Sequence, residues 1–119
     1  MRRTIKVIFL ESAKQEYDRL KEVVQLQIFQ GKKHSIEIQL LRSINQKLDL
    51  LKVNPVYGNK IKKELLEKAY AVDNLWRVEL TGYWRMLYTL KTDKIQINCF
   101  ILDILDHNRY NKKFGYKKK

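Results

Sequence analysis

The chain is poor in residues that cross-link or interrupt a fold. It holds one cysteine, one proline and four glycines in 119 residues. Cys99 has no second cysteine to pair with, and its neighbours Ile97 and Ile101 predict a buried thiol in a reducing compartment. The proline lies in the segment 55–59, the one strong break, which is too short to be an interdomain linker. We therefore expect residues 1–119 to form a single domain with one core.

Long apolar runs are also missing. No segment approaches the roughly 20 apolar residues that span a bilayer. The apolar stretch from Ile5 to Leu10 contains Lys6, stops at Glu11 and has no small-residue cleavage site, so we interpret it as a strand and not as a signal peptide. There is no metal-ligand cluster, glycine-rich phosphate loop or Ser/His/Asp spacing, and we expect no metal and no cofactor. These absences predict a cytoplasmic protein without a membrane partner.

Acidic side chains are few compared with basic ones. The chain has 25 Lys and Arg against 13 Asp and Glu, a net charge of +12, with an ordinary hydrophobic content of 45%. A positive field spread over both halves of the chain concentrates phosphate polyanions at the surface. RNA is therefore the expected partner. An acidic protein would satisfy the same charge, and a lysine-rich surface that only confers solubility is the plain alternative.

Hydrophobic periodicity predicts an α+β domain. Period-two alternation indicates a strand over residues 4–10 and three more near 75–81, 83–91 and 94–105. Between them, two stretches of helical spacing are joined by a short turn that holds His34, which we expect to be solvated. We expect the two helices to form an antiparallel hairpin packed on one face of the sheet, and the last three strands to form an antiparallel meander.

Both helices have a candidate N-cap and an apolar stripe. Ser12 with Gln15 matches a capping box for the first helix, and Ser35 is the expected N-cap of the second, which Pro55 ends. The expected stripes are Ala13, Tyr17, Leu20, Val24 and Ile28, and then Leu41, Ile44, Leu48 and Leu51. The lysine-rich segment 60–68 fits either a helical turn or an irregular basic loop.

The turn between the second and third strands has two possible registers. A two-residue loop at Thr81-Gly82 would place Arg85 opposite Val78 among apolar side chains, where an unpaired guanidinium is costly. A three-residue loop, in which Gly82 takes a positive φ, instead aligns Glu79 with Arg85 and Arg77 with Leu87. We predict the second register. It turns Trp76, Val78, Leu80, Trp84, Met86 and Tyr88 to the core, and puts Arg77, Glu79 and Arg85 together on the opposite face.

For the next hairpin we predict a two-residue turn at Thr92-Asp93. This turn pairs Tyr88 with Ile97 and Met86 with Cys99 on the core side. It also places Gln96, Asn98 and Phe100 beside Arg85 on the opposite face. The last strand then ends at Asp106 and brings the segment 107–110 to the edge of the same sheet.

This face holds the groups that cleavage of an RNA backbone needs. The reaction requires a base for the 2′-hydroxyl proton, an acid for the leaving 5′-oxygen and cations around the phosphorane. His107 fits either the base or the acid, Glu79 fits the base, and Arg77 with Arg85 fits the phosphate. Tyr110 is a candidate to stack on a base or to orient the phosphate, and Phe100 is a second platform. Candidate RNA-binding residues around them are Lys60, Lys62, Lys63, Arg109, Lys112, Lys113 and the terminal lysines.

Each assignment has a plainer alternative. Glu79 between two arginines is equally explained as a cross-strand charge pair, worth roughly 0.2 to 1 kcal/mol. His107 near Asp103 and Asp106 is explained as a hydrogen-bonded strand end. The lysines are explained as a solvated surface.

Four segments, taken in order, resemble the RelE/ParE superfamily of type II toxin-antitoxin toxins. They are 58–62, 75–78, 83–88 and 107–110, and the most specific is a Tyr-x-Arg-x-x-Tyr strand followed one strand later by His-x-x-Tyr. The resemblance covers most of the chain. It implies a ribosome-dependent mRNA endoribonuclease that acts without a metal, contacts mRNA and rRNA, and is held silent by an acidic antitoxin in a hetero-oligomer.

The resemblance also implies roles for single residues. Arg85 matches the family's phosphate-binding arginine, Arg77 a basic position on the preceding strand, and Tyr110 the C-terminal tyrosine. His107 falls where some members have histidine and others arginine. Glu79 falls where RelE has a lysine, which favours a Glu or His base here. The superfamily also includes ParE-like inhibitors of DNA gyrase, so gyrase inhibition and RNA binding without catalysis are the alternative functions.

Overall fold

The computed structural model describes residues 3–115, except for the side chains of residues 66–68. This part of the chain contains five strands and four α-helices. In chain order the elements are β1 (Thr4–Phe9), α1 (Glu11–Phe29), α2 (Ile36–Val53), β2 (Asn59–Lys60), α3 (Lys63–Ala69), β3 (Trp76–Glu79), a 3₁₀ turn (Thr81–Tyr83), β4 (Arg85–Thr92), β5 (Gln96–Leu105) and α4 (His107–Lys113). No helix among these residues is long and apolar enough to cross a membrane.

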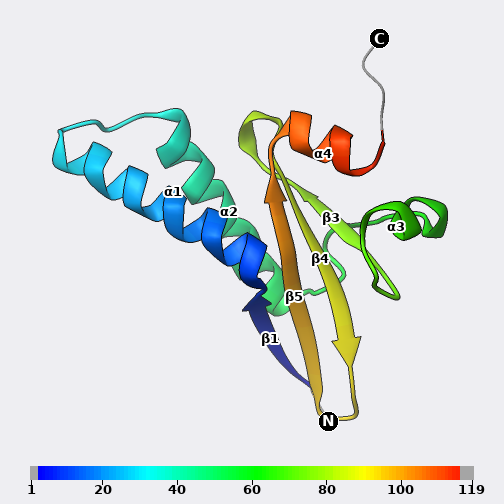
Figure 1. The fold of residues 1–119 in the computed structure, drawn as a ribbon. Coiled ribbons are helices and arrows are strands. Elements are labelled where there is room, and N and C mark those ends of the chain that lie inside the picture. The colour runs from blue at the N-terminus through cyan, green and yellow to red at the C-terminus, as the bar shows by residue number, and fades with distance from the viewer. Residues whose placement is uncertain (1–2, 116–119) are drawn as a thin grey trace.

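The strands form one mixed sheet in the order β1-β5-β4-β3-β2. β3, β4 and β5 are the expected antiparallel meander, whereas β1 pairs in parallel with β5, Thr4 opposite Gln96. The α1–α2 hairpin lies along one side of the sheet, while α3 and α4 lie on the other side (Figure 1). The predicted α+β class and the helix hairpin are therefore confirmed, and the second side of the sheet carries helices as well.

The main core lies between the helix hairpin and the sheet. From the helices it buries Ala13, Leu20, Val24, Ile38, Leu40, Ile44, Leu48 and Leu51, and from the sheet Val78, Leu80, Met86, Tyr88, Cys99, Ile101 and Ile104. The predicted apolar stripes supply most of the helical part of this core. Ile28 is an exception, because its side chain is exposed near the end of α1 together with Leu26 and Phe29.

Helix starts show one correct and one wrong prediction. Ser35 caps α2, accepting a hydrogen bond from the Ile38 backbone N–H at 2.9 Å. The capping box at Ser12 and Gln15 is wrong, since α1 already begins at Glu11 and has no side-chain cap. Ser12 instead donates its hydroxyl to Asp103, which links the first turn of α1 to β5.

The turn between β3 and β4 adopts the predicted three-residue geometry. Gly82 has φ of 67°, Glu79 lies opposite Arg85, and Arg77 lies opposite Leu87. Trp76 lies opposite Tyr88, on the side that packs against the α1–α2 hairpin. The register therefore turns Arg77, Glu79 and Arg85 to the other face of the sheet.

The predicted turn of the β4–β5 hairpin is wrong. The turn lies two residues further along, at Lys94-Ile95, because the Asp93 carboxylate accepts hydrogen bonds from the backbone N–H groups of Ile95 and Gln96. Tyr88 therefore pairs with Ile101 and Leu90 with Cys99. Because the register slips by an even number of residues, Gln96, Asn98 and Phe100 keep their predicted face. They do not lie beside Arg85 as predicted, because Phe100 is opposite Thr89 and the other two residues lie still closer to the β4–β5 turn.

A β-bulge then changes the alternation near the end of β5. Leu87 pairs with Asp103 and Tyr88 with Ile101, so Leu102 has no partner in the ladder. After the bulge, Ile104 points to the main core and Leu105 to the opposite face. Arg85 thereby comes to lie opposite Leu105, next to the residues that begin α4.

The opposite face has a small core of its own. It buries Leu75, Leu87, Leu102, Leu105, Tyr110 and Phe114, with Ile61, Leu65, Ala69, Tyr70 and Val72 packed around them. The open question about residues 60–68 is resolved as strand β2 followed by α3. The segment after Asp106, expected to lie at the sheet edge, is helix α4, and Asp106 is its N-cap through the Arg109 backbone N–H.

Candidate active site

Two arginines and one carboxylate lie together on the face of the sheet that carries α4. Glu79 Oε1 is 3.1 Å from Arg77 Nε, and Glu79 Oε2 is 3.4 Å from Arg85 Nε. The Glu79 side chain is 51% exposed, whereas that of Arg85 is only 16% exposed. The carboxylate thus holds two guanidinium groups side by side and remains accessible to solvent.

The Tyr110 side chain contacts both arginines. The Arg85 guanidinium carbon lies 4.4 Å from the centre of the Tyr110 ring, a cation–π contact, and Arg77 Nη1 donates to the Tyr110 hydroxyl at 2.9 Å. Tyr110 comes from the middle of α4 and is 3% exposed. Its ring is therefore covered by protein and is not open to stacking on an RNA base. The other predicted role, orienting the scissile phosphate, stays a prediction.

His107 completes the cluster at the first residue of α4. Its Nδ1 lies 3.5 Å from Arg85 Nη1, and its Nε2 lies 3.2 Å from the side-chain nitrogen of Asn111. Since a guanidinium only donates, Nδ1 is the acceptor in the contact with Arg85. His107 is exposed on the outer side of the cluster, with one ring nitrogen beside Arg85 and the other beside Asn111.

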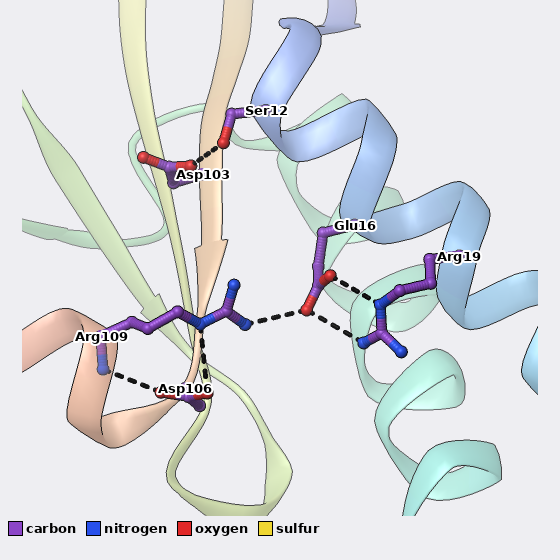
Figure 2. Close-up of polar contacts among 6 residues, drawn as sticks. All are labelled: Ser12, Glu16, Arg19, Asp103, Asp106 and Arg109. Atoms are coloured by element: carbon purple, nitrogen blue, oxygen red, sulfur yellow. Dashed lines mark hydrogen bonds and ion pairs between the residues drawn. The ribbon is translucent and has the colours of Figure 1, made fainter.

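The position of α4 is fixed by an ion-pair network that reaches α1. Arg109 donates to Glu16 at 2.9 Å and to Asp106 at 3.1 Å, and Glu16 also accepts from Arg19 (Figure 2). Burial raises the pKa of Glu16, but the hydrogen bonds from the two arginines outweigh it, so the pKa is lowered overall. Glu16 therefore stays ionised and holds α4, with His107 and Tyr110, against the first helix.

A second anchor fixes the other side of the cluster. The Tyr88 hydroxyl donates to the Pro55 carbonyl at 2.8 Å and accepts from the Gly58 N–H at 3.0 Å. A Cβ on Gly58 would lie 2.8 Å from the Arg77 carbonyl oxygen, so only glycine allows this close approach. Burial raises the pKa of Tyr88 to about 12, which keeps the hydroxyl protonated. These contacts place Asn59 of β2 opposite Arg77.

Two hollows adjoin the cluster. One, of about 470 Å³, borders His107 and is lined by Gly82, Tyr83, Trp84, Asp106, His107 and Asn108. The other, of about 320 Å³, borders Arg77 and Glu79 and is lined by these residues with Lys47, Tyr57, Gly58, Asn59 and Val78. Space that a ligand chain can occupy therefore lies beside His107 in one hollow and beside Arg77 and Glu79 in the other.

The structure does not bring all of the remaining predicted residues to the cluster. Lys60 lies over the Trp76 ring at 5.8 Å, and Lys113 over the Tyr70 ring at 4.8 Å. Lys62, Lys63 and Lys112 are exposed at the start of α3 and the end of α4. Arg109 is engaged in the network to α1 and lies over Trp84. Phe100 lines a separate hollow with Leu10 and Leu102, and the terminal lysines lie outside the described residues.

Sequence reasoning gave no role to Tyr83. Its ring is 76% exposed and lies 6.2 Å from the His107 ring, and its φ of 63° is unusual for a residue other than glycine. In the sequence, Tyr83 stands directly after the glycine of the predicted turn and is the first residue of the Tyr-x-Arg-x-x-Tyr motif. Within the described residues, no three His, Cys, Asp or Glu side chains gather in a way that could hold a metal ion.

Comparison with known proteins identifies a related fold. No family model and no curated protein sequence matches the chain. Among solved structures, a YoeB/ParE toxin from Agrobacterium tumefaciens is similar with a TM-score of 0.55 at 13% sequence identity, and the match covers 86% of this chain and 98% of that one. The chain therefore has the RelE/ParE-type toxin fold, which is the fold implied by the resemblance of its sequence motifs.

Proposed function

We propose that the protein is a toxin that cleaves mRNA by attack of a 2′-hydroxyl on the adjacent phosphate. The observation that carries the proposal is the packing of Arg77 and Arg85 on Tyr110, beside Glu79 and His107. Guanidinium groups fixed in advance stabilise the charge of a phosphorane without reorganising during the reaction. The Glu79 carboxylate and the His107 imidazole, which both contact Arg85, supply sites for proton transfer.

Each residue has a defined role in this reaction. Arg85 and Arg77 bind the non-bridging oxygens of the scissile phosphate. Glu79, which lies between the two guanidinium groups, accepts the proton of the 2′-hydroxyl as that oxygen bonds to phosphorus. The imidazolium form of His107 donates a proton to the 5′-oxygen as the bond between that oxygen and phosphorus breaks, which leaves a neutral imidazole. The products are a 2′,3′-cyclic phosphate and a free 5′-hydroxyl, and Tyr110 acts by orienting the arginines.

The proposed partners follow from the charge and the fold. A net charge of +12 favours an RNA-rich environment such as the ribosome, where the substrate is mRNA. Lys60, Lys62, Lys63, Lys112 and Lys113 then contact phosphates around the site. The fold neighbour is described as a toxin, and a toxin of this class needs an inhibitor, for which an acidic antitoxin has the complementary charge.

Cleavage assays on translating ribosomes test the proposal. Purified protein should cut mRNA at positions linked to codons and leave 2′,3′-cyclic or 3′-phosphate ends. Arg85→Ala and His107→Ala should abolish the cuts. Lys94→Ala is the matched control, since Lys94 is an exposed cation in the β4–β5 turn, at the opposite end of β4 from Arg85. Uncut message with the wild-type protein would disprove the reaction.

Inhibition of DNA gyrase is the second candidate function. The ion pairs of Glu79 with both arginines are compatible with it, because inhibition needs no catalytic base and a charge pair that only stabilises the sheet has the same geometry. The name of the fold neighbour also includes ParE. A supercoiling assay separates the two functions, since inhibition of gyrase together with intact mRNA would support the second.

A further inference from the structure

Tyr83 has a backbone conformation that its residue type disfavours. Both Gly82 and Tyr83 lie in the left-handed region, with φ of 67° and 63°. Glycine adopts this region freely and asparagine tolerates it, whereas a bulky side chain is strained there. The Tyr83 ring recovers little by packing, because it is 76% exposed. The strained position therefore holds an aromatic ring out toward solvent.

The surrounding turn keeps Tyr83 in place. Leu80 and Trp84 flank the turn, and the Leu80 N–H donates to the Trp84 carbonyl at 2.8 Å, which closes the turn. The Thr81 N–H donates to the Ser43 hydroxyl at 3.2 Å, which ties the turn to α2. A ring carried by such a turn is positioned in advance, and a ligand that stacks on it pays little for ordering the protein.

The ring faces the proposed cleavage site. Its centre lies 6.2 Å from the centre of the His107 ring, and the two rings are tilted by 58°. Tyr83 and His107 both line the hollow of about 470 Å³, together with Trp84 and Asn108. His107 in turn contacts Arg85, so this one side chain separates the hollow from the proposed phosphate position.

We propose that Tyr83 is a stacking platform for one unpaired base of single-stranded RNA, held in this hollow beside the scissile phosphate. The inference rests on the proposed function and specifies the form of its substrate. Bases of single-stranded RNA splay out and stack on exposed aromatic rings, whereas paired bases cannot reach one. Tyr110 cannot fill this role, since its ring is buried under Arg85. Tyr83 is the exposed ring next to His107.

Binding of a short single-stranded RNA tests the platform. The probe carries 2′-O-methyl groups, which prevent cleavage, and one fluorescent 2-aminopurine, whose emission falls when it stacks on an aromatic ring. The variants are Tyr83→Phe, which keeps the ring, and Tyr83→Asn, which removes it and tolerates the left-handed backbone. Phe29→Asn is the matched control, because Phe29 is an exposed aromatic residue at the end of α1.

We expect Tyr83→Asn to weaken RNA binding by about 5- to 160-fold, the range that corresponds to loss of one stacked base. The fluorescence change should vanish with it, while Tyr83→Phe and Phe29→Asn should behave as wild type. Tyr83→Asn should unfold at the same or a higher temperature than wild type, so that a folding defect does not explain the loss.

The outcomes separate this inference from the proposed reaction. Wild-type binding and fluorescence in Tyr83→Asn would overturn the platform, even if the wild-type protein cleaves mRNA on ribosomes. Weaker binding in Tyr83→Asn would support the platform, even if no cleavage occurs. A wild-type protein that does not bind the probe would overturn the platform directly.

Discussion

Replacing Glu79 with glutamine separates catalysis from simple charge pairing. As the general base, Glu79 contributes about 10²- to 10⁴-fold to the rate, so Glu79→Gln should lower single-turnover cleavage by that factor. RNA binding should become tighter, because Glu79 lies 3.1 Å from Arg77 and 3.4 Å from Arg85 and its negative charge opposes a bound phosphate.

The charge-pair interpretation predicts a different result for the same variant. A cross-strand pair contributes about 0.2 to 1 kcal/mol to the free energy of unfolding and nothing to the rate. The assay is therefore single-turnover cleavage with saturating protein on programmed ribosomes, with the RNA dissociation constant and urea unfolding measured in parallel. Glu22→Gln, on the exposed side of α1, is the matched control for loss of one carboxylate. Cleavage at the wild-type rate in Glu79→Gln would refute the assignment of the base.

Three further predictions concern the scaffold of the site. Tyr88→Phe should lower the free energy of unfolding by about 1–3 kcal/mol in urea titrations, because it removes the hydroxyl that serves Pro55 and Gly58; an unchanged midpoint would contradict the anchor. Burial raises the pKa of Cys99 to about 12, so iodoacetamide should modify it at mildly alkaline pH only after unfolding, and rapid native modification would show an accessible thiol. The pKa of Glu16 is lower in the folded chain than its ordinary value of 4.5, so its stabilising effect is present above that pH and lost as the pH falls through the folded value. Glu16→Gln should therefore lose less stability than wild type on acidification, and equal losses would contradict the network.

The turn geometry was predictable because one costly side chain decided between two registers. Burial of an unpaired guanidinium would have cost more than any gain from the shorter loop, and Arg85 was therefore placed correctly with Glu79 and Arg77. The β4–β5 turn offered no such test. Its position depends on backbone hydrogen bonds to the Asp93 carboxylate, and alternation is the same for every register that differs by an even number.

The sequence predicted that Arg77, Glu79, Arg85, His107 and Tyr110 lie together, but it did not predict the contacts that join them. Helix α4 has only seven residues and buries one of them, Tyr110, so hydrophobic periodicity over such a length does not distinguish a helix from a tail. The contact of Arg85 with the Tyr110 ring and the ion pair of Arg109 with Glu16 join segments that are distant in sequence. The sequence assigned no role to Tyr83, because the positive φ of this residue has no signature in composition or spacing.

The unpaired residue Leu102 determines which side of the molecule carries the C-terminal groups. It shifts the pleat by one residue, so that Leu105 points away from the helix hairpin and the chain continues toward Arg85. Without Leu102, β5 would alternate strictly. The chain that leads to His107 and Tyr110 would then leave the strand on the other face of the sheet from the arginines. The length of β5, as much as the identity of any side chain, is thus a condition for bringing His107, Tyr110 and the two arginines to one place.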